Sequence, residues 1–206
     1  MKKIVAIVVL LGLFSCSEKE VQLPQAEVSV LKDIVDHSPI YMFFEIQNKK
    51  DTIIDVNRKN SISSTNWVFN IDKRLPLKLV IPEVIKLQEK KANSAHSKKD
   101  AIDVFSYSDS IGKNLAFFPF TDVKYKLDKE FSKFFIKKHA TEYTPYHNFT
   151  INFNKKNVIT IDGLEVDRDE FVAFIKEFSD FTNDGKLIML HLNFDKNLTY
   201  GDYIKN

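Results

Sequence analysis

The chain has 206 residues, in which 30 lysines and arginines are almost balanced by 28 aspartates and glutamates. This balance excludes the strong positive field that a nucleic-acid-binding protein needs, so we expect no nucleic-acid partner. The 18 phenylalanines and only 5 glycines favour a packed globular body over a disordered chain. No glycine-rich phosphate loop or dinucleotide fingerprint occurs, so we expect no nucleotide cofactor.

Residues 1–15 have the pattern of a signal peptide. Two lysines precede the uncharged run Ile4–Phe14, which is too short for a membrane span of about 20 residues and fits a signal-peptide core of about 7–15 residues. The run ends in Leu13-Phe14-Ser15-Cys16, which resembles the lipobox of bacterial lipoproteins. The resemblance implies that Cys16, the only cysteine, is acylated and becomes the first residue of the mature protein. The alternative is a short buried helix with an incidental cysteine.

Acylation of Cys16 implies a location as well as a modification. Two or more acyl chains anchor a protein stably, so the membrane becomes its first partner. We expect a lipid-anchored protein of the bacterial cell envelope at the outer membrane, on either its periplasmic face or the cell surface. The stretch Ser17–Glu20 partly matches the export signals of surface lipoproteins in Bacteroidetes-type bacteria. Residues 16–26 are expected to form a polar tether, in which Pro24 and the charges oppose a helix.

Residues 27–147 are expected to form an N-terminal α+β module. Residues 27–36 fit a strand and a helical turn equally well. Runs rich in aromatic and β-branched residues predict strands over 40–47, 51–57, 66–72, 101–109 and 115–122. Pro119 makes the last of these an edge or bulged strand. A helix is predicted over 81–91, with Pro82 in its first turn.

The next segments alternate between predicted helices and strands. A helix is expected over 128–139, capped by Asp128 and with an apolar face made by Phe131, Phe134 and Phe135. Residues 144–150 resemble a turn, and 157–163 a strand. A helix capped by Asp167 should then run to about residue 181, followed by a fully buried strand over 186–195. The apolar positions expected on one face of that helix are Phe171, Phe174, Ile175 and Phe178.

The last part of the chain, residues 148–206, resembles the periplasmic domain of ExbD/TolR biopolymer transport proteins. The matching stretches are "VITIDGLEVDRDEFVAFIKEF" and "LIMLHLNFDKNLTYGDYI". The resemblance implies an interaction module in which the Tyr-Gly pair opens the next helix. Proton coupling is not implied, because the leader carries no acidic residue between Ile4 and Phe14. The residues that carry most of the resemblance, and that are candidates for interaction, are Asp195, Lys196, Asn197, Tyr200 and Gly201.

The helix that follows in that family is expected to be absent here, since the sequence stops at Asn206. We expect the helix over 128–139 to cover the apolar face left open, and a second protein is the alternative. The first half also contains a candidate repeat, which would pair Asp72 with Asp162 and Asp109 with Asp195. The fold class is therefore α+β, with a short mixed sheet and two or three amphipathic helices packed on it, arranged as one module or as two ExbD/TolR-like modules.

No catalytic or metal-binding motif stands out. The five histidines lack a metal-ligating spacing, and Asp167 and Asp169 are explained by capping and the helix dipole. We therefore expect no metal and no cofactor. The expected function is a non-enzymatic interaction or scaffold module associated with envelope biopolymer transport. The alternative is an envelope enzyme that acts on glycan or another envelope substrate through acidic residues.

Overall fold

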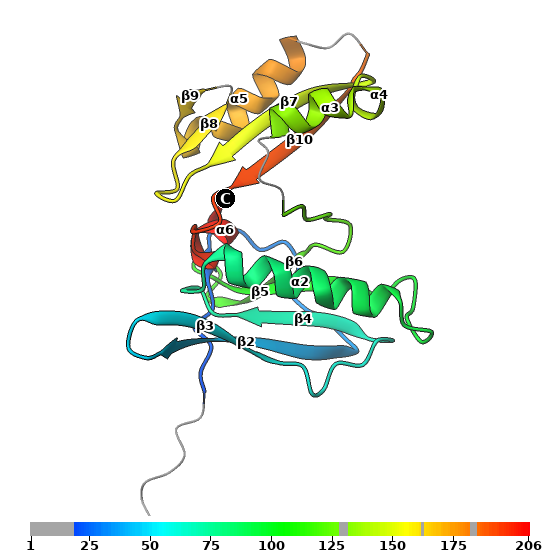
Figure 1. The fold of residues 1–206 in the computed structure, drawn as a ribbon, viewed down its shortest axis with the longest axis vertical. Coiled ribbons are helices and arrows are strands. Elements are labelled where there is room, and N and C mark those ends of the chain that lie inside the picture. The colour runs from blue at the N-terminus through cyan, green and yellow to red at the C-terminus, as the bar shows by residue number, and fades with distance from the viewer. Residues whose placement is uncertain (1–18, 128–131, 162, 182–184) are drawn as a thin grey trace, which may run out of the picture.

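The computed structural model describes residues 19–127, 132–161, 163–181 and 185–206. Figure 1 shows two mixed β-sheets, one below the other, with helices α2 and α6 between them. The predicted α+β class is confirmed, although the strands form two sheets instead of one. Within the described residues, no helix combines the length and the apolar character that crossing a bilayer requires.

The first sheet contains every strand that the sequence predicts before residue 123. Its order is β3-β2-β4-β5; β1 continues along one side of β5 and β6 pairs with the other side. The turn between β2 and β3 is tight, because Asn48 and Lys49 adopt positive φ angles of 52° and 60°. The strands are β1 (Gln25–Ala26), β2 (His37–Gln47), β3 (Asp51–Asn57), β4 (Asn66–Ile71), β5 (Asp103–Asp109) and β6 (Asn114–Pro119).

Helix α2 (Leu77–Ala92) covers the inner face of the first sheet. It begins four residues earlier than predicted, so Pro82 lies inside the helix and its placement in the first turn was wrong. Pro76 stands before the first turn instead, with the extended ψ of 147° that an N-cap position requires. The loss of one helix hydrogen bond at Pro82 is offset by burial of the helix side chains Leu77, Val80, Ile81, Val84 and Leu87.

The outer face of the first sheet carries a smaller apolar cluster. Ile34 packs with Val68, Val104 and Phe117, so residues 31–36 cover part of this face. Leu31 exchanges two backbone hydrogen bonds with Phe117 of β6, at 3.1 and 2.9 Å. Residues 27–36 are thus neither a regular strand nor a helical turn.

The second sheet has the order β10-β7-β8-β9, and β10 runs parallel to β7. The sequence prediction missed β7, because 144–150 resembled a turn. The alternation of Phe149, Ile151 and Phe153, all buried, is the strand signal that was overlooked. The expected module boundary after residue 147 falls inside this strand. The strands are β7 (Tyr146–Phe153), β8 (Ile159–Ile161), β9 (Leu164–Val166) and β10 (Leu187–Phe194).

Helix α5 (Arg168–Phe181) packs on one face of the second sheet, as its apolar positions predict. Phe178 meets Phe149 edge to face at 4.2 Å, and the Asp167 carboxylate accepts the N–H of Asp169 at 3.2 Å. The predicted cap and apolar face of α5 are therefore confirmed. The predicted burial of β10 is wrong, because β10 lies at the edge of the sheet and several of its leucines are exposed.

Helices α3 (Ser132–Lys138) and α4 (Ala140–Tyr143) lie on the other face of the second sheet. Tyr143 packs edge to face against His191 at 5.2 Å, and Asn148 donates a side-chain hydrogen bond to the Tyr143 carbonyl at 2.8 Å. Phe134 is exposed, so its expected place on the covered apolar face was wrong. Asp128 and Phe131 lie outside the described residues.

Candidate functional site

Each sheet leads into a helix through nearly the same short sequence. "FNIDKRLPLK" spans residues 69–78 after β4, and "LNFDKNLTYG" spans residues 192–201 after β10. Both strands run parallel to the first strand of a hairpin, β4 beside β2 and β10 beside β7. The first copy opens α2, and the second opens α6 (Tyr200–Lys205). The expected absence of a following helix was therefore wrong.

The two copies also fold the same way locally. The N–H of Asp72 donates to the Met42 carbonyl at 3.0 Å, and the N–H of Asp195 donates to the Phe153 carbonyl at 2.8 Å. Each aspartate carboxylate accepts the N–H two residues later, at 3.0 Å for Asp72 and 2.7 Å for Asp195. These Asx-type bonds make each copy turn sharply out of its strand.

The two turns then pair with each other about an approximate two-fold axis. The N–H of Leu77 donates to the Leu198 carbonyl at 2.9 Å, and the N–H of Tyr200 donates to the Leu75 carbonyl at 2.7 Å. Pro76 and Thr199 face each other in an antiparallel bridge at the centre. We call this pairing of residues 72–78 with 195–201 the junction.

A second pair of bonds repeats the symmetry one residue further along each helix. The N–H of Lys78 donates to the Lys196 carbonyl at 2.8 Å, and the N–H of Gly201 donates to the Lys73 carbonyl at 2.9 Å. The first N–H groups of a helix have no partner inside it. At the junction, the carbonyls of one turn satisfy the first N–H groups of the helix that follows the other turn.

The junction contains every residue that the sequence put forward for interaction. Asp195 shapes the turn, Lys196 contributes its carbonyl, and Tyr200 is fully buried. A Cβ on Gly201 would lie 3.1 Å from the Lys73 carbonyl oxygen, so glycine permits the close approach of the backbones. Gly201 lies in the first turn of α6, so the Tyr-Gly pair opens a helix as the resemblance implies. Of these five candidate residues, only Lys196 and Asn197 are well exposed. Most contacts of the five are made with the first half of the same chain.

The repeat therefore has a different register from the one expected. Asp72 is the counterpart of Asp195, and Asp109 is not. Asp109 ends β5, and its carboxylate accepts the N–H groups of Ile111 and Gly112 in the hairpin that leads to β6. Asp162 lies outside the described residues. A direct alignment of the two Asp-Lys-x-Leu stretches would have revealed the register from sequence.

Asp72 is the most strongly held charge of the junction. Its buried carboxylate accepts two hydrogen bonds from the Arg74 guanidinium, at 2.8 and 2.7 Å, and one from the N–H of Gln22 at 3.2 Å. Burial alone would raise the pKa of Asp72, but the hydrogen bonds from Arg74 and Gln22 outweigh it and hold the pKa below its usual range. Asp72 thus fastens the incoming N-terminal segment to the first turn.

A chain of aromatic rings joins the two sheets behind the turns. Tyr200 meets Phe105 of the first sheet at 5.6 Å, and Tyr203 meets Phe194 of the second sheet at 4.8 Å. The hydroxyls of Tyr125 and Tyr203 lie 3.1 Å apart. Burial raises the pKa of Tyr200 and of Tyr203. These tyrosines therefore stay protonated at neutral pH and serve as packing groups.

A hollow of about 320 Å3 opens beside the junction. It is lined by Lys73, Arg74 and Lys205, with Asp202 as the acidic member. Arg74 is paired with Asp72, and the Asp202 carboxylate accepts the Thr199 hydroxyl at 2.6 Å. The hollow has a basic rim but contains neither a cysteine or histidine nor two carboxylates facing each other. Its basic rim is suited to a weak contact with an anionic group.

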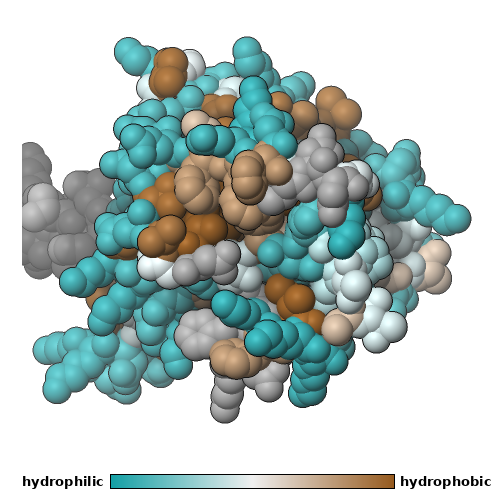
Figure 2. Space-filling model, turned by 90° about the horizontal axis from the view of Figure 1, so that it is seen from above, coloured by the Kyte–Doolittle hydropathy of each residue, from teal (hydrophilic) through white to brown (hydrophobic). Residues whose placement is uncertain are grey.

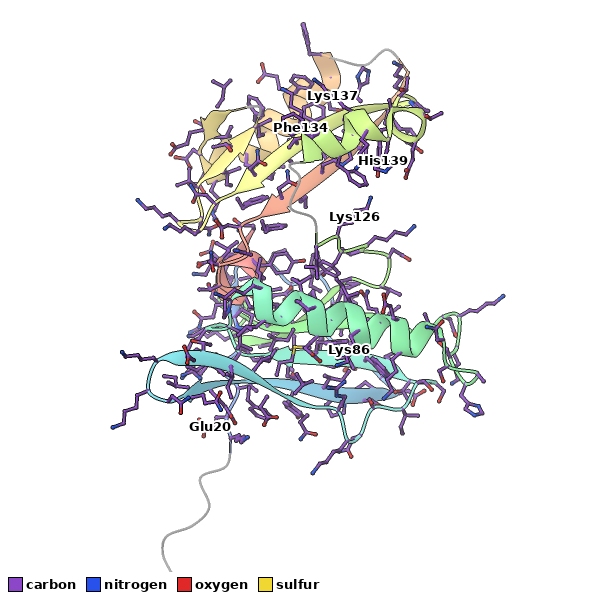
Figure 3. All side chains as sticks on the ribbon, viewed as in Figure 1. Glu20, Lys86, Lys126, Phe134, Lys137 and His139 are labelled. Carbon is purple, nitrogen blue, oxygen red and sulfur yellow. The ribbon has the colours of Figure 1, made fainter. Side chains whose placement is uncertain are left out.

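The remaining candidates for chemistry have structural partners. His191 Nε2 lies 2.9 Å from Asn148 Oδ1, and its pKa is lowered by burial and by the charge of Lys126. Lys126 lies 3.9 Å from the centroid of the Phe135 ring, below the side chains of α3 labelled in Figure 3. In the described part of the chain, no three His, Cys, Asp or Glu side chains are grouped to hold a metal. Cys16 lies outside the described residues.

The depressed pKa of Asp72 predicts an acid-sensitive fold. Its ionised carboxylate stabilises the fold above its unfolded pKa of about 4, and this contribution is lost as pH falls through the lower folded value. Asp72→Asn should reduce the free energy of unfolding at neutral pH by on the order of 1–3 kcal/mol. In this variant, the free energy of unfolding should also fall less steeply between about pH 5 and pH 2 than in the wild type.

Urea unfolding at a series of pH values measures both effects. The matched control is Asp195→Asn, because Asn197 stands there in the place of Arg74 and no guanidinium accompanies the turn. Asp195→Asn should change the pH dependence of the free energy of unfolding less than Asp72→Asn does. Parallel pH profiles for wild type and Asp72→Asn would show that this carboxylate does not stabilise the fold.

Comparison with family models, with curated protein sequences and with solved structures finds no match for this chain. Its function is therefore argued from its own residues and their arrangement. Those residues form an internal two-fold junction that joins two related sheets, and among the described strands the apolar β10 ends the second sheet.

Proposed function

We propose that this protein is a lipid-anchored protein of the bacterial cell envelope. We propose further that it acts without catalysis, by binding a partner protein through β10, the open edge of its second sheet. The lipobox at Leu13–Cys16 supports the anchor at the outer membrane. The likeness of residues 148–206 to ExbD/TolR periplasmic domains supports a role associated with envelope biopolymer transport.

The observation that carries the binding role is a contrast between the two copies of the repeat. By the register of the junction, Leu190 and Leu192 of β10 are the counterparts of Trp67 and Phe69 of β4. Trp67 and Phe69 are 1% and 0% exposed, whereas Leu190 and Leu192 are 46% and 51% exposed. Two positions that are core in the first copy are therefore surface in the second.

The first copy also indicates what covers these positions. There β5 pairs in parallel with Trp67–Phe69 of β4, and α2, 16 residues long, lies over them. In the second copy, no described strand pairs with the outer side of β10. A parallel strand from another protein would occupy the position that β5 has beside β4.

The character of β10 suits strand addition. Its sequence, "LIMLHLNF", carries no lysine, arginine, aspartate or glutamate, the charges that usually protect an edge strand from pairing. Strand addition supplies main-chain hydrogen bonds, while alternate side-chain pockets provide specificity. The partner segment that fits is therefore extended and apolar at alternate positions.

Further exposed apolar side chains lie on α5, which packs on the second sheet. Figure 2, which views the molecule from the side of the second sheet, shows apolar side chains gathered on this face. An apolar patch of several hundred Å2 commonly marks a protein interface. The exposed apolar residues of α5 and β10 are Val172, Phe178, Phe181, Leu187, Leu190 and Leu192.

The anchor is tested by metabolic labelling with a fatty-acid probe. Wild type should incorporate the probe and fractionate with membranes, and Cys16→Ser should do neither, because the acylated sulfur is lost. Equal labelling and membrane association of the two would contradict lipid anchoring at Cys16.

The binding surface is tested in the native envelope by replacing single residues with a photo-crosslinking amino acid. A probe at Leu190 or Leu192 should give a discrete protein adduct. The matched control is Leu115 of β6, which is also 46% exposed and lies on an edge strand of the first sheet. Leu190→Lys should abolish the adduct formed at Leu192. Equal adducts at Leu115 and Leu190, or none at β10, would contradict partner binding at this edge.

A further inference from the structure

Lys19, the first described residue, is fixed to the outer face of the first sheet, the face opposite α2. Lys19 Nζ pairs with the carboxylate of Glu45 on β2 and with that of Asp55 on β3, the latter at 2.6 Å. It also lies 5.9 Å from the centroid of the Phe43 ring. Hydrogen bonds to Asp55 and then to Glu45 raise the pKa of Lys19 to about 12, so the lysine is cationic at every physiological pH.

The residues after Lys19 are also bound to the first sheet and its turn. The N–H of Gln22 donates to Asp72 Oδ2 at 3.2 Å, and the Gln22 carbonyl accepts the N–H of Lys73 at 2.8 Å. β1, at Gln25–Ala26, then pairs with the end of β5. The described part of the expected tether, residues 19–26, is thus held by the body of the protein.

This attachment limits the distance between the anchor and the sheet. Cys16 precedes Lys19 by three residues, and three extended residues span at most about 10 Å. A lipid on Cys16 therefore brings the outer face of β2 and β3 close to the lipid headgroups. A free tether of residues 16–26 would have allowed a separation several times larger.

The chemistry of that face suits an uncharged lipid surface. Tyr41, 37% exposed, stacks on Phe43 with ring centroids 5.9 Å apart. Aromatic side chains of this kind favour the boundary between lipid and water. Lys19 balances only one of the two carboxylates beside it, so this part of the face has no excess positive charge for anionic lipids.

We propose that the outer face of the first sheet, around Tyr41 and Phe43, rests on the membrane surface, and that the Lys19 ion pairs hold the protein in this orientation. The second sheet lies on the α2 side of the first sheet, opposite the face that Lys19 contacts, so β10 is held away from the bilayer (Figures 1 and 3). The orientation rests on the proposed lipid anchor, and it presents the proposed binding edge to partners in the surrounding compartment.

The test uses the acylated mature protein in phosphatidylcholine vesicles that contain a lipid spin-labelled at the headgroup. A single cysteine is introduced as Asn57→Cys, which lies opposite Tyr41 on the same face, or as Phe181→Cys on α5. Because Cys16 is the only natural cysteine and is acylated, a fluorophore attaches only to the new residue. Quenching at residue 57 should exceed quenching at residue 181 severalfold.

Lys19 variants test the cause of the orientation. Lys19→Glu places a third carboxylate beside Glu45 and Asp55, so the difference in quenching should disappear while the protein still floats with the vesicles. Lys19→Arg keeps the charge and should keep the difference. Circular dichroism checks that both variants are folded.

The outcomes separate the two proposals. Equal quenching at residues 57 and 181 in protein that floats would overturn the orientation and leave the anchor intact. Equal orientation in Lys19→Glu and wild type would overturn the role of Lys19. Failure of the acylated protein to float would overturn the anchor and, with it, the orientation.

Discussion

The architecture depends on four backbone hydrogen bonds between two turns that are distant in sequence. At the start of α2 and of α6, two N–H groups would lack partners, and burying them unpaired would cost about 1–3 kcal/mol each. The carbonyls of the opposite turn remove this cost in both places. Leu75, Leu198 and Tyr200 lose all exposed surface in the same contact. Neither helix start is satisfied in this way without the other turn, so the turn at residues 195–201 is part of the structure of the first half.

Much of the fold follows from patterns that the sequence displays, but the junction does not. Strands such as β3, and the apolar face of α5, are set by local periodicity and were predicted from it. β7 was missed because its asparagines and histidine resemble turn residues, although Phe149, Ile151 and Phe153 alternate. β10 looked buried because it is apolar, and only its place in the sheet order shows that it is an edge. The candidate residues around Asp195 were identified correctly as a group, but the surface that they meet, residues 72–78, could be known only from the tertiary pairing.

The internal repeat also connects the fold to the proposed function. Two related turns place two related strands, β4 and β10, and β5, which pairs with β4, has no described counterpart beside β10. The same turn residue, Asp72, holds residue Gln22 of the N-terminal segment, so the junction links the end of the chain with the proposed anchor to β10, the edge proposed to bind a partner. The proposed membrane contact on one side and the proposed partner strand on the other would then both follow from one arrangement.

The central claim is that the junction makes the two sheets one cooperative unit, and two-probe unfolding tests it most directly. Trp67, the single tryptophan, reports on the first sheet by fluorescence, and amide hydrogen exchange of β7 and β10 reports on the second. In urea, both probes should show one coincident transition. Leu198→Ala should shift both by the same amount, with a loss of about 2–5 kcal/mol for a buried leucine. Two separate transitions, or a Trp67 transition that Leu198→Ala leaves unchanged, would contradict the account.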